Sequence, residues 1–223
     1  MKRSYLKIKK ITTFLHQCIR SDTSLLHLVL MYAWYLLFHG KRILKHQHVK
    51  IKGISNIKSE GLIRIGIGFV GFSGKKDSTI LNIRGKLVIE GDYYIGRGCR
   101  FDIGDEAVAV IGKGGFINCN NRIVIMHGLQ IGDNCIISWD CQFLDENFHS
   151  FSYEGQIAED KQKSIVIGNN VWIGNGVKIY QGAIIPDGCV VAAHSVIRGE
   201  FKRQNVLIGG MPAREIKSNV KWK

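Results

Sequence analysis

The sequence is poor in proline, in paired cysteines and, over its first quarter, in acidic residues. Its 2 prolines stand against 26 glycines, a composition rich in turns but far from that of collagen. The six cysteines form no C-x-x-C pair, so the sequence gives no support to a zinc ribbon or a thioredoxin-like site. We therefore expect no bound metal.

A long hydrophobic segment is also missing. The apolar run over residues 25–38 has fourteen residues, includes His27, and lacks a small-residue cleavage site after it. It is too short for a helix that spans a bilayer, and it begins too late for a signal peptide. The sequence therefore predicts a cytoplasmic protein in a reducing environment.

Acidic residues are nearly absent from residues 1–52, which hold eleven Lys or Arg and one acid, Asp22. This segment has a charge of +10, so the other 171 residues carry only +3 of the total charge of +13. The basic character therefore belongs to an N-terminal segment and not to the main body. Apolar residues make up 45% of the chain and charged residues 22%, which argues against wholesale disorder.

A period of six residues runs through most of the chain. In the C-terminal part an aliphatic residue recurs at every sixth position, and a small or β-branched residue follows four places after each of the first five. The aliphatic positions are Ile167, Ile173, Ile179, Ile185, Val191 and Ile197. Shorter sixfold runs lie upstream, separated by slips of ten and eight residues, and weaker repeats begin near Val49.

Such a period predicts a triangular coil of eighteen residues, in which each hexad supplies a short strand and a turn. Successive coils would stack as parallel strands about 4.8 Å apart, with Ile167 below Ile185 and Ile173 below Val191. Four cysteines, at positions 99, 135, 141 and 189, fall on the small interior position of the hexad. We expect them to be small buried hydrophobic residues and not nucleophiles.

These tandem hexads resemble those of the hexapeptide-repeat acyltransferases. Residues 166–216 are similar to the C-terminal part of sugar O-acetyltransferases that act on maltose, galactosides, capsule or O-antigen. The family's terminal G-N-P-A-[KR] motif is present at residues 210–214 as GMPAR, with Met211 in place of Asn. The resemblance covers about residues 83–217.

The resemblance implies an all-β solenoid, a left-handed parallel β-helix of hexapeptide repeats, with an N-terminal α-helical segment and a short C-terminal tail. We expect the basic helical segment over residues 1–48 and the β-helix catalytic domain over residues 49–210. Residues 150–163 would leave the coil as a loop, and residues 211–223 would form the tail. In this family three such subunits form a homotrimer, with the active site between two of them.

The resemblance also implies direct transfer of an acetyl group from acetyl-CoA to a sugar hydroxyl, in capsule or O-antigen biosynthesis. A base must remove the hydroxyl proton, and a histidine suits this role because its pKa lies near neutrality. The family's D-x-x-x-H arrangement is matched by Asp145 and His149, where the hexad rhythm fails. His149 is the expected base, and Asp145 or Glu146 is expected to orient its imidazole.

By the same resemblance, Gly174 and Ala192 line the pantetheine arm of the donor, because they are eighteen residues apart and both small. Arg214 matches the family's terminal basic residue and, with Arg198, is a candidate for the phosphates of coenzyme A. For all four residues, an ordinary corner or surface role is the alternative interpretation.

Three further residues are candidate contacts with the sugar acceptor. Trp139 and Asp140 directly precede the catalytic stretch, and His127 lies in one of the slips of the repeat. Trp139 could equally be packed at the trimer interface, and a structural role is the stronger alternative for His127.

The apolar N-terminal helix, flanked by basic residues, has two competing interpretations. It packs on the end of the β-helix or on another subunit, or it lies on the inner face of the cytoplasmic membrane. Nucleic-acid binding is weaker, because the segment contains no recognised module.

Three other functions remain open. The first is an acetyltransferase for a small soluble acceptor. The second is a γ-type carbonic anhydrase, which the absence of an H-x-x-x-x-H pair in the repeat disfavours. The third is a non-catalytic scaffold, which would bind no thioester and would be indifferent to His149→Ala.

Overall fold

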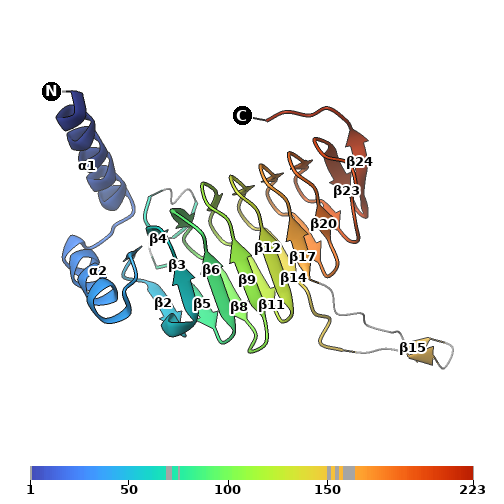
Figure 1. Cartoon of the computed structure of the whole chain (residues 1–223), viewed down its shortest axis with the longest axis horizontal. Helices are drawn as coiled ribbons and strands as arrows, with labels where there is room; N and C mark the ends of the chain where they lie inside the picture. The colour runs from blue at the N-terminus through green and yellow to red at the C-terminus, as the bar shows by residue number, and fades with distance from the viewer. Residues whose placement is uncertain are drawn as a thin grey trace.

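The computed structural model describes residues 2–68, 72–74, 76–149, 152–153, 156–157 and 164–222. It is a left-handed parallel β-helix with two helices at its N-terminal end (Figure 1). Consecutive strands belong to three different sheets, here called A, B and C, so that each turn of the chain adds one strand to every sheet. The predicted solenoid is therefore confirmed.

Sheet A contains, in spatial order, β1 (Ile43–Lys45), β4 (Ile63–Ile65), β7 (Tyr93–Ile95), β10 (Phe116–Ile117), β13 (Ile136–Ile137), β18 (Trp172–Ile173), β21 (Val190–Val191), β23 (Leu207–Gly210) and β24 (Ala213–Lys217). Sheet B contains β2 (Val49–Lys52), β5 (Thr79–Ile83), β8 (Arg100–Ile103), β11 (Arg122–Ile125), β14 (Gln142–Leu144), β19 (Lys178–Tyr180) and β22 (Val196–Ile197).

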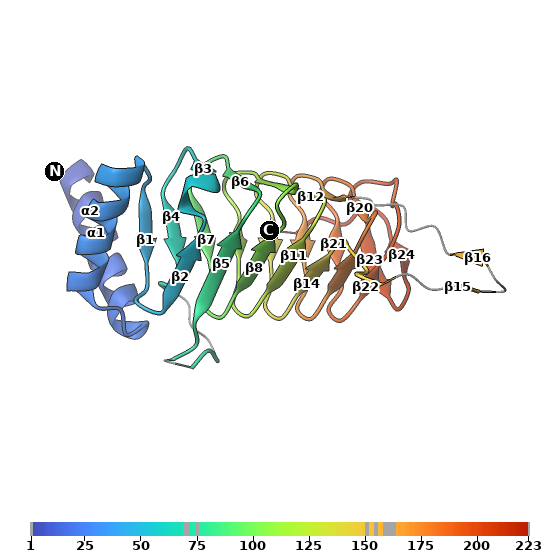
Figure 2. The ribbon, with the colours of Figure 1, turned by 90° about the horizontal axis from the view of Figure 1, so that it is seen from below.

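Sheet C contains β3 (Ile57–Ser59), β6 (Lys86–Ile89), β9 (Val108–Ile111), β12 (Gly128–Ile131), β17 (Ile165–Ile167) and β20 (Ile184–Ile185). A short 3-10 helix, η1 (Ile54–Asn56), precedes β3. Two further strands, β15 (Ser152–Tyr153) and β16 (Gln156–Ile157), pair antiparallel and lie away from the solenoid body (Figures 1 and 2). They belong to the predicted loop between β14 and β17.

The core is the inside of the coil. Ile167 lies opposite Ile185 and Ile173 opposite Val191, as the period predicts. All four of these side chains are buried, and burial of aliphatic side chains is the main favourable term in folding. The six cysteines are buried and unbridged. Burial raises the pKa of the Cys99 thiol to about 12, so this group is not an activated nucleophile.

The turns between strands need backbone conformations that few residues adopt. Asn120, Asn134 and Asn170 have φ between 54° and 60°, and Gly98 has φ of 77°. A Cβ on Gly98 would lie 1.9 Å from Oδ1 of Asn120 in the next coil. Glycine is therefore required there by both the backbone conformation and the approach of the neighbouring coil.

Helices α1 (Lys2–Arg20) and α2 (Leu25–His39) cover the N-terminal end of the solenoid (Figure 2). The side chain of Ser24 accepts a hydrogen bond from the backbone N–H of His27, and Gly40 ends α2 with φ of 62°. Leu28 and Tyr35 are buried against the solenoid. The buried guanidinium of Arg97 donates to the carbonyl of Ser21 between the helices.

Both ends of the solenoid differ from the expected boundaries. Its first strand is β1, which begins at Ile43, within the segment assigned to residues 1–48. At the other end, residues 213–217 of the expected tail form β24, which pairs antiparallel with β23. Helices α1 and α2 both lie within residues 1–48, the segment that was expected to be helical.

Candidate active site

The predicted catalytic residues gather at one edge of the solenoid, where strands of sheet B turn into sheet C. We call this the B–C edge. His127 lies in the corner that follows β11, and residues 145–149 follow β14. Strands β11 and β14 are neighbours in sheet B, with Ile123 opposite Phe143. The two segments therefore leave the sheet side by side.

The Asp145 carboxylate is fully buried and holds these two segments together. Its Oδ1 accepts a hydrogen bond of 2.7 Å from the backbone N–H of Met126. Its Oδ2 accepts bonds of 2.9 Å and 2.8 Å from the N–H groups of His127 and Gly128. A corner exposes such N–H groups, and burial would leave them unpaired without this acceptor.

Asp145 was expected to orient the imidazole of His149. Within the part of the chain that the structure describes, no hydrogen bond joins the two side chains; the Asp145 contacts are those with the backbone of residues 126–128. Asp145 thus fixes the start of the departing segment. A direct role toward His149 stays a prediction.

Glu146 and His127 form an ion-pair geometry at the same edge. Oε2 of Glu146 lies 2.7 Å from Nε2 of His127, and both side chains are about one-fifth exposed. Oε1 of Glu146 accepts hydrogen bonds from the backbone N–H groups of Asn147 and Phe148. The bonds from Phe148 and from His127 lower the pKa of the Glu146 carboxyl below its usual value, so an ionised carboxylate faces the imidazole of His127.

His149 is exposed at the last described position before the extruded loop. Phe148, the residue before it, has φ of 62° and is 57% exposed, so the chain bends sharply outward there. No hydrogen bond links the His149 imidazole to another described residue. The ring is therefore open to a substrate on the B–C edge.

Trp139 and Asp140 lie at a different edge, where strands of sheet A turn into sheet B. We call this the A–B edge. The ring of Trp139 packs edge-on against Phe72, with 6.1 Å between ring centroids, and remains 37% exposed. Asp140 is exposed in a left-handed turn with φ of 59°. Sheet B separates these two residues from His149 of the same chain.

Gly174 and Ala192 also lie at the A–B edge, one coil apart as predicted from their spacing. A Cβ on Gly174 would lie 2.7 Å from the backbone N of Ala193. The close approach of the next coil therefore explains this glycine, whether or not a donor binds beside it. Ala192 is partly exposed.

The two candidate phosphate contacts are separate from each other. Arg198 follows β22 at the B–C edge, with its guanidinium carbon 4.9 Å from the ring centre of Tyr180. Arg214 is exposed on β24 in sheet A. Its neighbour Glu215 forms an ion pair with Arg203.

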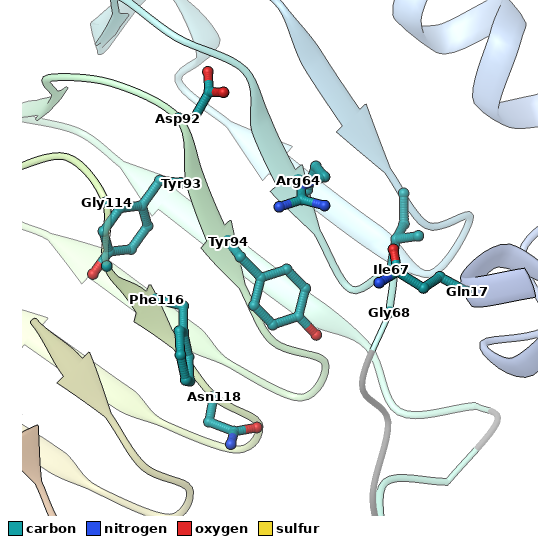
Figure 3. Close-up of a pocket in the computed structure, with 11 residues that line it drawn as sticks. Gln17, Arg64, Ile67, Gly68, Asp92, Tyr93, Tyr94, Gly114, Phe116 and Asn118 are labelled. Atoms are coloured by element: carbon teal, nitrogen blue, oxygen red, sulfur yellow. The ribbon is translucent and has the colours of Figure 1, made fainter. Parts of the chain in front are cut away.

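Two surface hollows were missed by the sequence analysis. One, of about 580 Å³, lies on sheet A near α1 and is lined by residues that include Tyr94, Phe116 and Arg64 (Figure 3). Its lining comes from strands 22 to 30 residues apart, so no local motif marks it. The other lies on sheet B beside Asp140 and is described below. Neither contains His149.

A metal site and a membrane-spanning helix are both absent from the residues that the structure describes. Among them, no group of three or more His, Cys, Asp or Glu side chains is arranged to hold a metal ion. Nor do they include a helix long and apolar enough to cross a membrane.

Comparison with known proteins agrees with this fold. The family model for the bacterial transferase hexapeptide (six repeats) matches residues 164–199. An uncharacterized 24.8 kDa protein in the cps region of Klebsiella pneumoniae is 38% identical over 218 residues, which cover 96% of each chain. WbbJ of Escherichia coli K12, named as a lipopolysaccharide biosynthesis O-acetyl transferase, is 28% identical over 142 residues, 60% of this chain and 72% of WbbJ.

Among solved structures, a mutant of AntD, an N-acyltransferase from Bacillus cereus bound to dTDP and coenzyme A, is similar in fold. It is 18% identical, with a TM-score of 0.46, over 80% of this chain and 82% of its own. The repeats and the corner geometry define a hexapeptide-repeat transferase. This chain belongs to that family, and it is an acyltransferase.

We predict that Asp145→Asn destabilises the fold, because an amide has one acceptor oxygen and would turn its NH2 group toward backbone donors. The expected loss is about 1–3 kcal/mol in the free energy of unfolding, measured by urea denaturation. Asp105→Asn is the matched control: this carboxylate is 70% exposed in an ion pair with Arg84, and its loss should change stability little. Equal effects of the two substitutions would contradict the anchoring role of Asp145.

Proposed function

We propose that this protein is an O-acetyltransferase that moves an acetyl group from acetyl-CoA to a sugar hydroxyl of a surface polysaccharide, with His149 as the general base. The observation that carries the proposal is the exposed imidazole of His149 on the B–C edge of a hexapeptide-repeat acyltransferase. The names of WbbJ and of the relative in the cps region support a lipopolysaccharide or capsule acceptor.

In the proposed reaction, Nε2 or Nδ1 of His149 takes the proton of the acceptor hydroxyl as its oxygen attacks the thioester carbonyl. The tetrahedral intermediate then breaks its carbon–sulfur bond. The imidazolium returns the proton to the departing thiolate, so the products are the acetylated sugar and coenzyme A. Asp145 is a positioning residue, since its bonds to residues 126–128 fix where the segment that bears His149 begins.

The paired side chains of His127 and Glu146 also have a role in the proposed reaction. Because the carboxylate of Glu146 holds the imidazole of His127 at 2.7 Å, this ring has a defined position at the B–C edge. We assign it to contact with the acceptor and not to proton removal. Its partner also fixes the backbone of Phe148, next to His149.

The donor is proposed to lie along the A–B edge, beside Gly174 and Ala192, with Arg198 and Arg214 as candidate phosphate contacts. Trp139 and Asp140, on the same edge, would contact the acceptor. Acetyl-CoA is the donor that the resemblance of the repeats implies, and membership of the hexapeptide transferase family supports this choice.

This arrangement places the base and the donor-lining residues on different edges of one chain. The strand between them, β14, has three residues, about 10 Å of chain, and its face separates the two edges. A second copy can place its A–B edge against the B–C edge of the first. We therefore propose a homotrimer with shared active sites, as in the family that the sequence resembles.

The apolar helices suggest a second contact, with the membrane surface. Eleven of the eighteen large exposed apolar side chains among the described residues lie on α1 and α2, including Leu26 at 72%, Leu37 at 77% and Phe38 at 71%. The inner face of α2 packs on the solenoid. Packing on the end of the β-helix therefore leaves the outer face of the helix available for a membrane. Because residues 1–52 carry a charge of +10, we propose that the outer face binds anionic lipid from the cytoplasmic side.

For catalysis, His149→Ala is expected to lower sugar-dependent thiol release from acetyl-CoA by about 100-fold or more. Affinity for coenzyme A, measured by calorimetry, should persist because the imidazole acts on the acceptor hydroxyl. His48→Ala, at another exposed histidine, is the control and should keep full activity. If the His149 variant transfers acetyl groups normally, the base lies elsewhere.

For shared sites, we predict complementation between His149→Ala and Ala192→Glu, each inactive alone. Co-expressed subunits that mix freely should recover activity at about one quarter of the sites, where an intact B–C edge meets an intact A–B edge. A doubly substituted chain mixed with either single variant is the control. Mixed oligomers without recovered activity would place each site within one chain.

For membrane contact, the protein should sediment with vesicles that contain anionic lipid, and less with neutral vesicles or in high salt. The double substitution Leu26→Glu and Leu37→Glu should reduce this binding by about 10-fold or more. Val108→Glu, at a 42% exposed position on sheet C, is the matched control. Binding that is indifferent to the helix substitutions, or a change in oligomer size instead, would assign the surface to another partner.

A further inference from the structure

A row of cations follows the outer face of sheet B. Arg100 on β8 lies opposite Arg122 on β11, Arg122 opposite Gln142 on β14, and Gln142 opposite Lys178 on β19. These four side chains line a groove of about 430 Å³, together with Asn120 and Asp140 of the A–B edge. We call it the cationic groove.

The three cations of the groove lack a carboxylate partner among the described residues. The guanidinium of Arg100 is held by the carbonyl and hydroxyl of Ser78 and by the carbonyls of residues 98 and 99, all uncharged. The side chains of Arg122 and Lys178 are exposed and form no hydrogen bond or ion pair with any described residue. Hydrogen bonds thus fix the position of the Arg100 guanidinium, whereas the charged groups of Arg122 and Lys178 have no partner among the described residues.

Some cations elsewhere on the solenoid do have a carboxylate partner. Just after β5 of sheet B, Arg84 reaches Asp102 at 3.4 Å and Asp105 at 2.8 Å. On the opposite side, Lys113 lies 3.8 Å from Asp133. Carboxylate partners of this kind are absent from the three cations of the cationic groove among the described residues.

Unpaired like charges on neighbouring strands raise the free energy of the empty protein. Parallel strands are about 4.8 Å apart, and Arg100 and Arg122 occupy directly opposite positions. Asp140 is the one anionic residue in the lining of the groove, so an excess of two positive charges remains. An anion bound between these side chains would relieve the repulsion and gain charge-assisted hydrogen bonds.

We propose that the cationic groove binds a carboxylate-bearing sugar residue of the acceptor glycan. This inference rests on the proposed sugar O-acetyltransferase function and names the acceptor class: an acidic glycan. The planar guanidinium of Arg122 matches a carboxylate with two parallel hydrogen bonds, and Lys178 adds a point charge. Gln142, Asn120 and Asp140 offer partners for the sugar hydroxyls. Asp140 is already assigned above to the acceptor.

The phosphates of coenzyme A are anions that these cations could also bind. The positions of the cations along the solenoid favour the glycan. Arg100 and Arg122 lie two coils and one coil before β14, whereas the residues assigned to the donor, Gly174 and Ala192, lie on later coils. Lys178, on β19, shares the coil of Gly174. The cationic groove therefore begins beside the coil of Gly174, and Arg122 and Arg100 extend it toward the N-terminal end.

The test is direct binding to the full-length protein, measured by calorimetry at low and high salt. The probes are oligomers of galacturonic acid, of a glucuronic-acid glycan and of sialic acid, each beside its carboxyl-reduced form. We expect at least one acid to bind about 10-fold more tightly than its reduced form, a preference that salt weakens. Arg122→Gln should remove about 10- to 100-fold of its affinity. Lys86→Gln, at an exposed cation on sheet C, should remove none.

Thermal unfolding separates binding from folding. Because Arg122 opposes another cation, the unliganded Arg122→Gln variant should unfold at the same Tm as the wild type or higher. A fall in Tm together with lost binding would make Arg122 a structural residue and overturn the proposal. So would equal affinity for every acid and its reduced form, or a loss of affinity for coenzyme A in place of the acid. Failure of the proposed function would appear separately, as absent thiol release with binding intact.

Discussion

The hydrogen bonds between successive coils are the constraint on which the rest of the structure depends. Apart from β15, β16 and β24, the strands pair in parallel with those of neighbouring coils, so that one inward residue lies above another along the solenoid. Only aliphatic and small side chains fit inside such a coil, and every outward residue is placed in a row with a spacing of about 4.8 Å. Edges and rows, rather than pockets within a core, are therefore what this fold offers to a substrate.

The part of the fold that follows a fixed period could be predicted from the sequence. Ile173 and Val191 stack because eighteen residues make one coil, and the small positions of Cys99 and Cys189 lie inside for the same reason. Strand β1 was missed because residues 43–48 lack the glycine and the regular aliphatic spacing of later hexads. The active-site candidates came from a family resemblance, which supplied residue types and not contacts.

What could not be predicted depends on register between coils of unequal length. Arg100, Arg122, Gln142 and Lys178 are separated by 22, 20 and 36 residues, so no constant period aligns them. The same applies to Asp145, whose partners at residues 126–128 lie in the preceding coil. The sequence could not show these bonds, which the carboxylate accepts because buried N–H groups must find an acceptor.

The extruded segment between β14 and β17 has a consequence for how such a protein diversifies. Gln142 pairs with Lys178 although 36 residues separate them, while Lys178 and Val196 pair across 18. The sequence between these strands is therefore longer by one coil length, and the strands after it keep the register they would have had without it. Such a segment can be lengthened, shortened or exchanged without shifting any strand of the solenoid, because strands outside the segment fix both of its ends. The solenoid thus fixes the register of the strands, and the segment beside the proposed catalytic histidine can vary independently of that register.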